Sequence, residues 1–137
     1  MSSRPTVVLD ASVGARWFKP ETSQEPALAL LGRAVSGEIA LAAPTHFVHE
    51  VLSVVRRYYS AGDVVPAWRR IQASGVTIIP LSDEVIVEAA AQCAALGCSF
   101  YDSLAPACAS LLGATLASAD ERAHGAYPGV LLIGNEP

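Results

Sequence analysis

Short apolar runs that alternate with amphipathic segments constrain the fold of this chain more than any other feature. The apolar runs span residues 6–9, 39–43, 76–80, 114–118 and 130–133. Between them, apolar residues recur at the spacing of helices that cover a sheet. Strands that alternate with helices imply right-handed crossovers and a parallel sheet with helices on both faces. We therefore predict an α/β fold, a three-layer α/β/α sandwich with a mainly parallel five-stranded sheet.

Local signals add detail to this prediction. The run at residues 76–80 is expected to be the clearest central strand after the first. Residues 22–25 resemble a capping box, and Thr45 is expected to cap the helix that follows it. Residues 102–103 are expected to open a later helix. Each of these expectations concerns where an element begins or where it lies in the sheet.

Length and composition indicate one folded domain over residues 1–137. The chain is 52% hydrophobic and only 16% charged, which is ample material for a core. Its net charge of -4 argues against broad electrostatic attachment to nucleic acid or membrane, so any nucleic-acid contact must be local or metal-mediated. The first apolar run is too short for a signal peptide, and three cysteines without a CxxC pair are expected to be small buried hydrophobes. We expect a cytoplasmic protein without membrane contact.

Four carboxylates lie at or near the expected starts of helices. Asp10, Asp102 and Asp120 lie at such junctions, and Glu50 lies in the first turns of a helix. Aspartate is a favoured N-cap and glutamate is favoured in a first turn, so a structural role competes with a chemical one. The three aspartates, however, share the carboxyl edge of a parallel sheet, where ligands collect. Glu50 is expected to reach them from a flanking helix.

Together, the four acids have the chemistry of a divalent-metal site. Carboxylates crowded into one site repel one another and raise their own pKa values unless a cation compensates. Oxygen ligands without a thiolate or imidazole partner favour Mg²⁺ or Mn²⁺. Such a site suits phosphodiester hydrolysis, in which the metal activates a water and stabilises charge on the phosphate. The residues alone thus indicate a metal-dependent nuclease beside the simpler reading of helix caps.

The sequence resembles the PIN-domain ribonucleases of the VapC toxin family over nearly its whole length. The resemblance is carried by VVLDASVGARWFKPE, APTHFVHEVLSVVRR, GCSFYDSLAPACASLLGATLASADERA and the final GVLLI, in that order. It implies a PIN-like fold and an acidic pocket that holds magnesium or manganese. It also implies endoribonuclease activity with 3′-hydroxyl and 5′-phosphate products, a toxin role beside a cognate antitoxin, and a homodimer.

The resemblance also implies roles for individual residues. It assigns the catalytic and metal-binding positions to four acids: Asp10, Glu50, Asp102 and Asp120. The three aspartates would contact metal directly, and Glu50 would hold a second ion or orient the attacking water. Ser12 and Ser118 match hydroxyl positions that commonly support the pocket. Ser53 stands where the family often has an asparagine.

Basic and histidine residues near these motifs are further candidates. Arg57 follows Glu50 by seven residues, about two helical turns, so it could hold an RNA phosphate from nearly the same helix face. Arg16 is the second candidate for an RNA contact. His46 and His49 could share a zinc ion, but their order is not that of HExxH. We expect one of them to pack or cap and the other to line the mouth of the pocket.

Two other classes of function stay open. A catalytically inert PIN-like scaffold would act through protein contacts, although the presence of all four acids argues against it. A receiver-like phosphoacceptor would also place carboxylates and magnesium at a sheet edge, but it uses a lysine after its last strand, and the sole lysine here is Lys19. Nucleotide-cofactor binding is disfavoured because the chain has neither GxGxxG after its first strand nor GxxxxGK.

Overall fold

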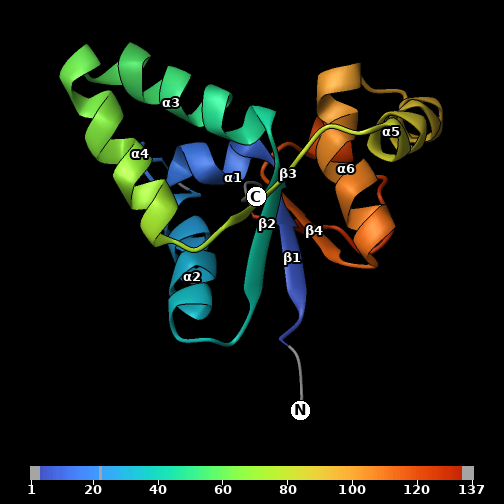
Figure 1. The fold of residues 1–137 in the computed structure, drawn as a ribbon, viewed down its shortest axis with the longest axis horizontal. Helices are drawn as coiled ribbons and strands as arrows, with labels where there is room; N and C mark the ends of the chain where they lie inside the picture. Colours follow the sequence, from blue (N-terminus) through green and yellow to red (C-terminus); the bar gives the residue numbers. More distant parts are fainter. Residues whose placement is uncertain (1–3, 22, 134–137) are drawn as a thin grey trace.

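The computed structural model describes residues 4–21 and 23–133, which form a five-stranded sheet flanked by helices (Figure 1). The strands are β1 Thr6–Leu9, β2 Ala40–Pro44, β3 Thr77–Ile79, β4 Thr115–Ser118 and β5 Leu131–Leu132. They lie in the order β3-β2-β1-β4-β5, and every neighbouring pair is parallel. The predicted α/β sandwich is confirmed, with a sheet that is wholly parallel in the described part of the chain.

Two groups of helices cover the two faces of the sheet (Figure 1). One face carries α1 Ala11–Arg16, α2 Gln24–Val35, α3 His46–Tyr58 and, after the 3₁₀ turn Ala61–Asp63, α4 Val64–Ala73. The other face carries α5 Asp83–Leu96 and α6 Phe100–Leu112. A short helix, α7 Glu121–His124, follows β4. The two groups enclose two separate hydrophobic cores, one on each side of the sheet.

Strand β1 contributes to both cores. Val7 and Leu9 belong to the core beneath α1–α4, whereas Val8 belongs to the core beneath α5 and α6. This alternation follows the two-residue period of a strand, and burial on both faces explains why the run is continuously apolar. Asp10 is the next residue, and its N–H donates to the carbonyl oxygen of Ala117 at 3.0 Å. The end of β1 therefore holds the backbone of Asp10 firmly at the carboxyl edge of the sheet.

Strand β3 lies at an edge of the sheet, so the prediction of a central strand at residues 76–80 is wrong. Within the described residues it pairs only with β2, and its residues are partly or fully exposed. An apolar β-branched run indicates a strand with at least one covered face, but it does not reveal how many neighbours the strand has. The crossover that places β3 beyond β2 decides its position.

Two predicted helix starts also differ from the structure. Helix α6 begins at Phe100, and its N-cap is Ser99, whose Oγ accepts the Asp102 N–H at 3.1 Å. Asp102 thus lies in the first turn instead of opening the helix. Thr45 makes no side-chain cap bond to α3. Thr22 of the predicted capping box lies outside the described residues, and Ser23 precedes α2 without a side-chain cap bond.

Gly14 allows α1 to approach α3 closely. A Cβ at Gly14 would lie 2.4 Å from Cζ of Phe47 and 2.8 Å from Cγ2 of Val51, well inside contact distance. Both neighbours are fully buried, so neither has space to move away. This contact sets the separation between the helix that follows Asp10 and the helix that carries Glu50.

The three cysteines differ in burial. Cys108 is buried, as predicted, and burial raises the pKa of its thiol to about 11. Cys93 and Cys98 are only partly buried, so the prediction of small buried hydrophobes holds for Cys108 alone.

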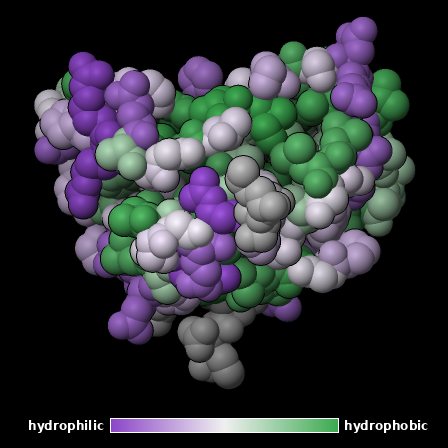
Figure 2. Space-filling view, turned by 60° about the horizontal axis from the view of Figure 1, so that its bottom comes forward, coloured by the Kyte–Doolittle hydropathy of each residue, from purple (hydrophilic) through white to green (hydrophobic). Residues whose placement is uncertain are grey.

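Apolar side chains also reach the surface. Val35 on α2 and Val87 on α5 are 73% and 71% exposed. The face shown in Figure 2 has hydrophobic residues, in green, between hydrophilic residues in purple. None of the helices in the described part of the chain is long and apolar enough to cross a membrane.

Candidate active site

Two carboxylates follow strands at the carboxyl edge of the sheet. Asp10 follows β1 directly and is 8% exposed, and its Oδ2 accepts the Ser12 N–H at 3.0 Å at the start of α1. Asp120 follows β4 after one intervening residue, and its Oδ1 accepts the Ala123 N–H at 3.1 Å at the start of α7. In each carboxylate the cap hydrogen bond uses one of the two oxygens. The cap role and a ligand role are therefore compatible in the same side chain.

The other two carboxylates lie on helices from opposite sides of the sheet. Glu50 lies on α3, and its side chain is 53% exposed. Asp102 lies in the first turn of α6 and is half-buried. Because α3 and α6 cover different faces of the sheet, these two acids approach the sheet edge from two directions.

All four acids line one cleft of about 290 Å³, which we call the acid cleft. Ser12, Arg16 and Arg57 line it too, so the cleft gathers seven of the eight residues singled out from the sequence. Ser118, the eighth, is fully buried behind it. The remaining lining residues are Ala11, Ala15, Lys19, Glu21, Val54 and Tyr58.

The acids influence one another electrostatically. The pKa of Glu50 is raised above its ordinary value, first by partial burial and then by the negative charges of Asp10 and Asp102. The contribution of Asp10 and Asp102 is the effect expected of carboxylates that share a site. The donor chemistry fits a hard divalent ion, because the cleft offers carboxylate oxygens from four elements. As the side chains lie, however, no three His, Cys, Asp or Glu of the described residues converge closely enough to hold a metal ion.

A buried histidine, His124, links the backbones of two acids. Its Nε2 lies 2.6 Å from the carbonyl oxygen of Asp102, and its Nδ1 lies 2.7 Å from Oγ of Ser118. Because a carbonyl only accepts, Nε2 carries the proton and Nδ1 accepts from the Ser118 hydroxyl. Oγ of Ser118 in turn accepts the Asp120 N–H at 3.0 Å. The network thus runs from Asp120 to Asp102 through two buried side chains.

Sequence reasoning missed this role of His124. The spacing of six residues between Ser118 and His124 was the available signal, but a bond from His124 to the carbonyl of Asp102 depends on tertiary structure. Ser12 has a similar role, because its Oγ accepts the Ala119 N–H at 2.9 Å and joins α1 to the end of β4. Both serines therefore position backbone next to the acids.

The two arginines differ in the contacts that their guanidinium groups already make within the protein. The Arg16 guanidinium donates from Nη1 to the Ser12 carbonyl at 2.8 Å and from Nε to the Ser23 hydroxyl, and it lies 3.7 Å from Glu21. Arg57 is exposed on α3, with its guanidinium 5.7 Å from the ring centroid of Tyr58. Arg57 is thus the more available cation for a bound phosphate.

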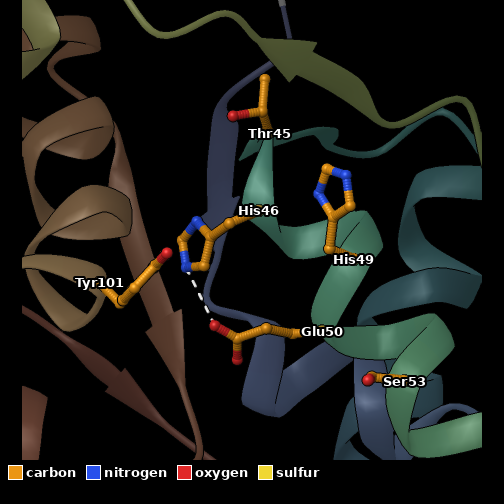
Figure 3. Close-up of a pocket in the computed structure, with 6 residues that line it drawn as sticks. All are labelled: Thr45, His46, His49, Glu50, Ser53 and Tyr101. Carbon is orange, nitrogen blue, oxygen red and sulfur yellow. Dashed lines mark ion pairs between the residues drawn. The ribbon is translucent and has the colours of Figure 1, made fainter.

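A second hollow of about 530 Å³ adjoins the acid cleft and shares Glu50 with it. We call it the histidine pocket; its lining residues are Thr45, His46, His49, Glu50, Ser53 and Tyr101. Figure 3 shows His46 and Tyr101 facing one another across it, from α3 and α6. His46 Nε2 lies 3.5 Å from Glu50 Oε1, and burial lowers the pKa of His46 despite the opposing charges of Asp10 and Asp102.

The histidines do not form a zinc site in this arrangement. His49 points away from Glu50 in Figure 3, and no group of three ligands includes either histidine among the described residues. His46 packs against Tyr101 with ring centroids 5.7 Å apart, whereas His49 is exposed. The expectation that one histidine packs fits His46, whereas His49 lines the adjoining histidine pocket and not the acid cleft.

Comparison with solved structures finds several similar folds. A chain of a toxin–antitoxin complex from Klebsiella pneumoniae matches with a TM-score of 0.71 and 18% identity, covering 96% of this chain and 99% of that one. The sarcin-ricin loop cleaving toxin VapC20 of Mycobacterium tuberculosis matches with a TM-score of 0.70 and 14% identity, with the same coverages of 96% and 99%. A chain of the DNA-bound VapBC2 complex of Rickettsia felis matches with a TM-score of 0.66 and 17% identity, covering 93% and 96%.

Sequence comparisons give a complementary result. No curated protein is significantly similar to the chain in sequence. The profile of the PIN domain family, by contrast, matches residues 7–127, a span that contains all four acids, both serines and His124. The fold, the acids at the sheet edge and this match agree, and the chain belongs to the PIN domain family.

Proposed function

We propose that this protein is a magnesium- or manganese-dependent endoribonuclease and the toxin of a toxin–antitoxin pair. The observation that carries the proposal is the acid cleft, in which four carboxylates from β1, α3, α6 and the end of β4 line one cavity. Gathering four of the carboxylates of a protein with a net charge of -4 into one cleft costs electrostatic free energy unless a cation joins them.

Each residue of the cleft has a role in this proposal. Asp10, Asp102 and Asp120 would hold the ion, and Glu50 would hold a second ion or orient the attacking water. A bound Mg²⁺ or Mn²⁺ would activate water and offset the charge that develops on the phosphate. Arg57, at the end of α3, would contact a phosphate that flanks the scissile one.

Known relatives support both the RNA substrate and the protein partner. VapC20 is described as cleaving the sarcin-ricin loop, and the Klebsiella and Rickettsia structures are complexes of toxins with antitoxins. A second observation is an apolar groove between α3 and α4, lined by Val48, His49, Leu52, Ser53, Val64, Val65 and Trp68. The groove shares His49 and Ser53 with the histidine pocket, so an antitoxin segment in it would pass beside the active site.

Cleavage of RNA tests the activity directly. Purified protein, incubated with total bacterial RNA and Mn²⁺ or Mg²⁺, should produce fragments with 5′-phosphates, and chelator should abolish them. Asp10→Asn should cut far less, because it removes one charge from the cleft, while asparagine still serves as an N-cap. Chelator-resistant cleavage, or full activity in Asp10→Asn, would overturn the mechanism.

One observation favours the alternative of an inert scaffold, namely that no three candidate ligands converge in the described residues. The scaffold alternative predicts no cleavage with either metal and growth unaffected by expression of the chain. The nuclease proposal predicts growth arrest that Asp10→Asn relieves. A homodimer is part of the same proposal, and light scattering after gel filtration tests it by the mass of the particle.

A further inference from the structure

We propose that the histidine pocket binds one nucleobase of single-stranded RNA, next to the phosphate that lies in the acid cleft. This inference rests on the proposed function and makes it more specific. It assigns a ligand class to a hollow of about 530 Å³, which falls in the usual range of about 300–1,000 Å³ for small-molecule sites.

The position of the pocket ties its occupant to the reaction. Glu50 lines both the acid cleft and the histidine pocket, so the two hollows meet at this carboxylate. A chain whose phosphate reaches the acids would therefore bring an adjoining nucleotide to the histidine pocket. The pocket then acts on the same substrate molecule as the acids.

The aromatic wall of the pocket suits a base. Tyr101 is 65% exposed at the start of α6, and its ring meets His46 on one side, with ring centroids 5.7 Å apart (Figure 3). Phe100 supports it in an edge-to-face contact, with ring centroids 6.3 Å apart. An exposed aromatic ring is a platform on which bases of single-stranded nucleic acids stack.

The polar wall suits a base better than a phosphate. No Lys or Arg of the described part of the chain lines the pocket, and the Glu50 carboxylate would repel a phosphate there. Thr45, Ser53 and His49 instead offer hydroxyl and imidazole groups for the edges of a base. Nδ1 of His46 is buried and has no hydrogen-bond partner among the residues that the structure describes.

Equilibrium binding of two matched probes tests the assignment. One probe is a fluorescein-labelled pool of random single-stranded RNA, and the other is an abasic ribose-phosphate chain of the same length. Ca²⁺ replaces Mg²⁺ in the assay, because its looser coordination supports binding without efficient cleavage. The quantity of interest is the ratio of the two dissociation constants, since that ratio cancels the contribution of the phosphates.

Wild-type protein should bind the RNA pool about 5- to 100-fold more tightly than the abasic chain, as one stacked base provides. Tyr101→Phe should keep this ratio because it keeps the ring, whereas Tyr101→Ala should bring the ratio close to one. Val87→Ala, a change at an exposed residue of α5, should leave the ratio unchanged. Circular dichroism checks that each variant is folded.

The possible outcomes separate this inference from the proposed function. If Tyr101→Ala keeps the wild-type ratio of dissociation constants while wild-type protein cuts RNA with Mn²⁺, the base pocket is overturned. The nuclease proposal then still stands. A ratio that depends on Tyr101 in a protein that never cuts RNA supports the base pocket and overturns the nuclease. An unchanged ratio with a changed oligomeric mass in Tyr101→Ala would assign the pocket to protein contact and overturn the inference.

Discussion

The strand-end acids, Asp10 and Asp120, and the helix-borne acids, Glu50 and Asp102, reach the same cleft by different means. Each strand-end acid follows a buried strand and has one carboxylate oxygen bound to the N–H of the helix that comes next. Glu50 lies within α3 instead of at its N-cap, is half exposed and has a raised pKa. Asp102 has its backbone held at both ends, by Ser99 and by His124.

This difference indicates a division between fixed and adjustable parts of the site. Backbone at the end of a central parallel strand moves little, because both faces of the strand are buried. A glutamate side chain on a helix surface reaches further and adopts more rotamers. The strand-end acids therefore define where an ion would lie, and the helix-borne acids would close around it.

The largest effect should come from a strand-end acid. We expect Asp10→Asn to lower the rate of metal-dependent RNA cleavage by more than about 100-fold, beyond the usual effect of a supporting residue. The melting temperature should stay close to that of the wild type, since asparagine also caps a helix. Asp83→Asn, at an exposed first-turn aspartate of α5, is the matched control and should retain full activity. Equal losses of cleavage activity in Asp10→Asn and Asp83→Asn would show that the effect is not specific to the strand-end acid.

His124 should have the next largest effect, because it supports one acid of each kind. We expect His124→Ala to lower kcat about 10- to 100-fold, as loss of an outer-shell partner does, with a weakened response to Mn²⁺. His124→Gln, which keeps a donor and an acceptor, should recover part of the activity. A folded His124→Ala with wild-type kcat and wild-type Mn²⁺ response would show that the network serves stability alone.

A third prediction concerns the spacing between α1 and α3. Gly14→Ala should destabilise the protein by about 1–3 kcal/mol, because the added methyl group overlaps Phe47 and Val51. Gly32→Ala on α2, where nothing lies within 4 Å, should instead stabilise it by about 0.5–1 kcal/mol. Urea denaturation measures both values. Equal changes in stability of the two variants would mean that α1 and α3 are not tightly packed at Gly14.

The smallest effect should appear in the pH dependence of stability without metal. Since the pKa of Glu50 is raised in the folded state, the unfolded chain loses its proton first as pH rises. Stability should therefore decrease as pH increases from about 4.5, the ordinary value, through the raised pKa of the folded state. Glu50→Gln should remove this slope, and Mn²⁺ should reduce it in the wild type. Denaturation curves across this pH range would contradict the prediction if Glu50→Gln kept the same slope as the wild type.

The strand-end acids were predictable from the sequence for a physical reason. A β-branched run that ends in aspartate specifies both a buried strand and a carboxylate at its carboxyl end, as at Asp10. The start of α6 was misplaced, because Ser99 caps the helix three residues before Asp102 and the short segment between them carries no helical period. The edge position of β3 and the bond from His124 to Asp102 depend on the packing of distant elements, which local patterns do not encode.

Binding of Mn²⁺ by calorimetry tests most directly whether acids from opposite sides of the sheet form one site. The comparison needs the wild type, Asp10→Asn at a strand end and Asp102→Asn on α6. The account predicts that the wild type binds Mn²⁺ and that each single substitution weakens binding strongly. Binding that is unchanged in either variant, or absent in the wild type, would contradict it.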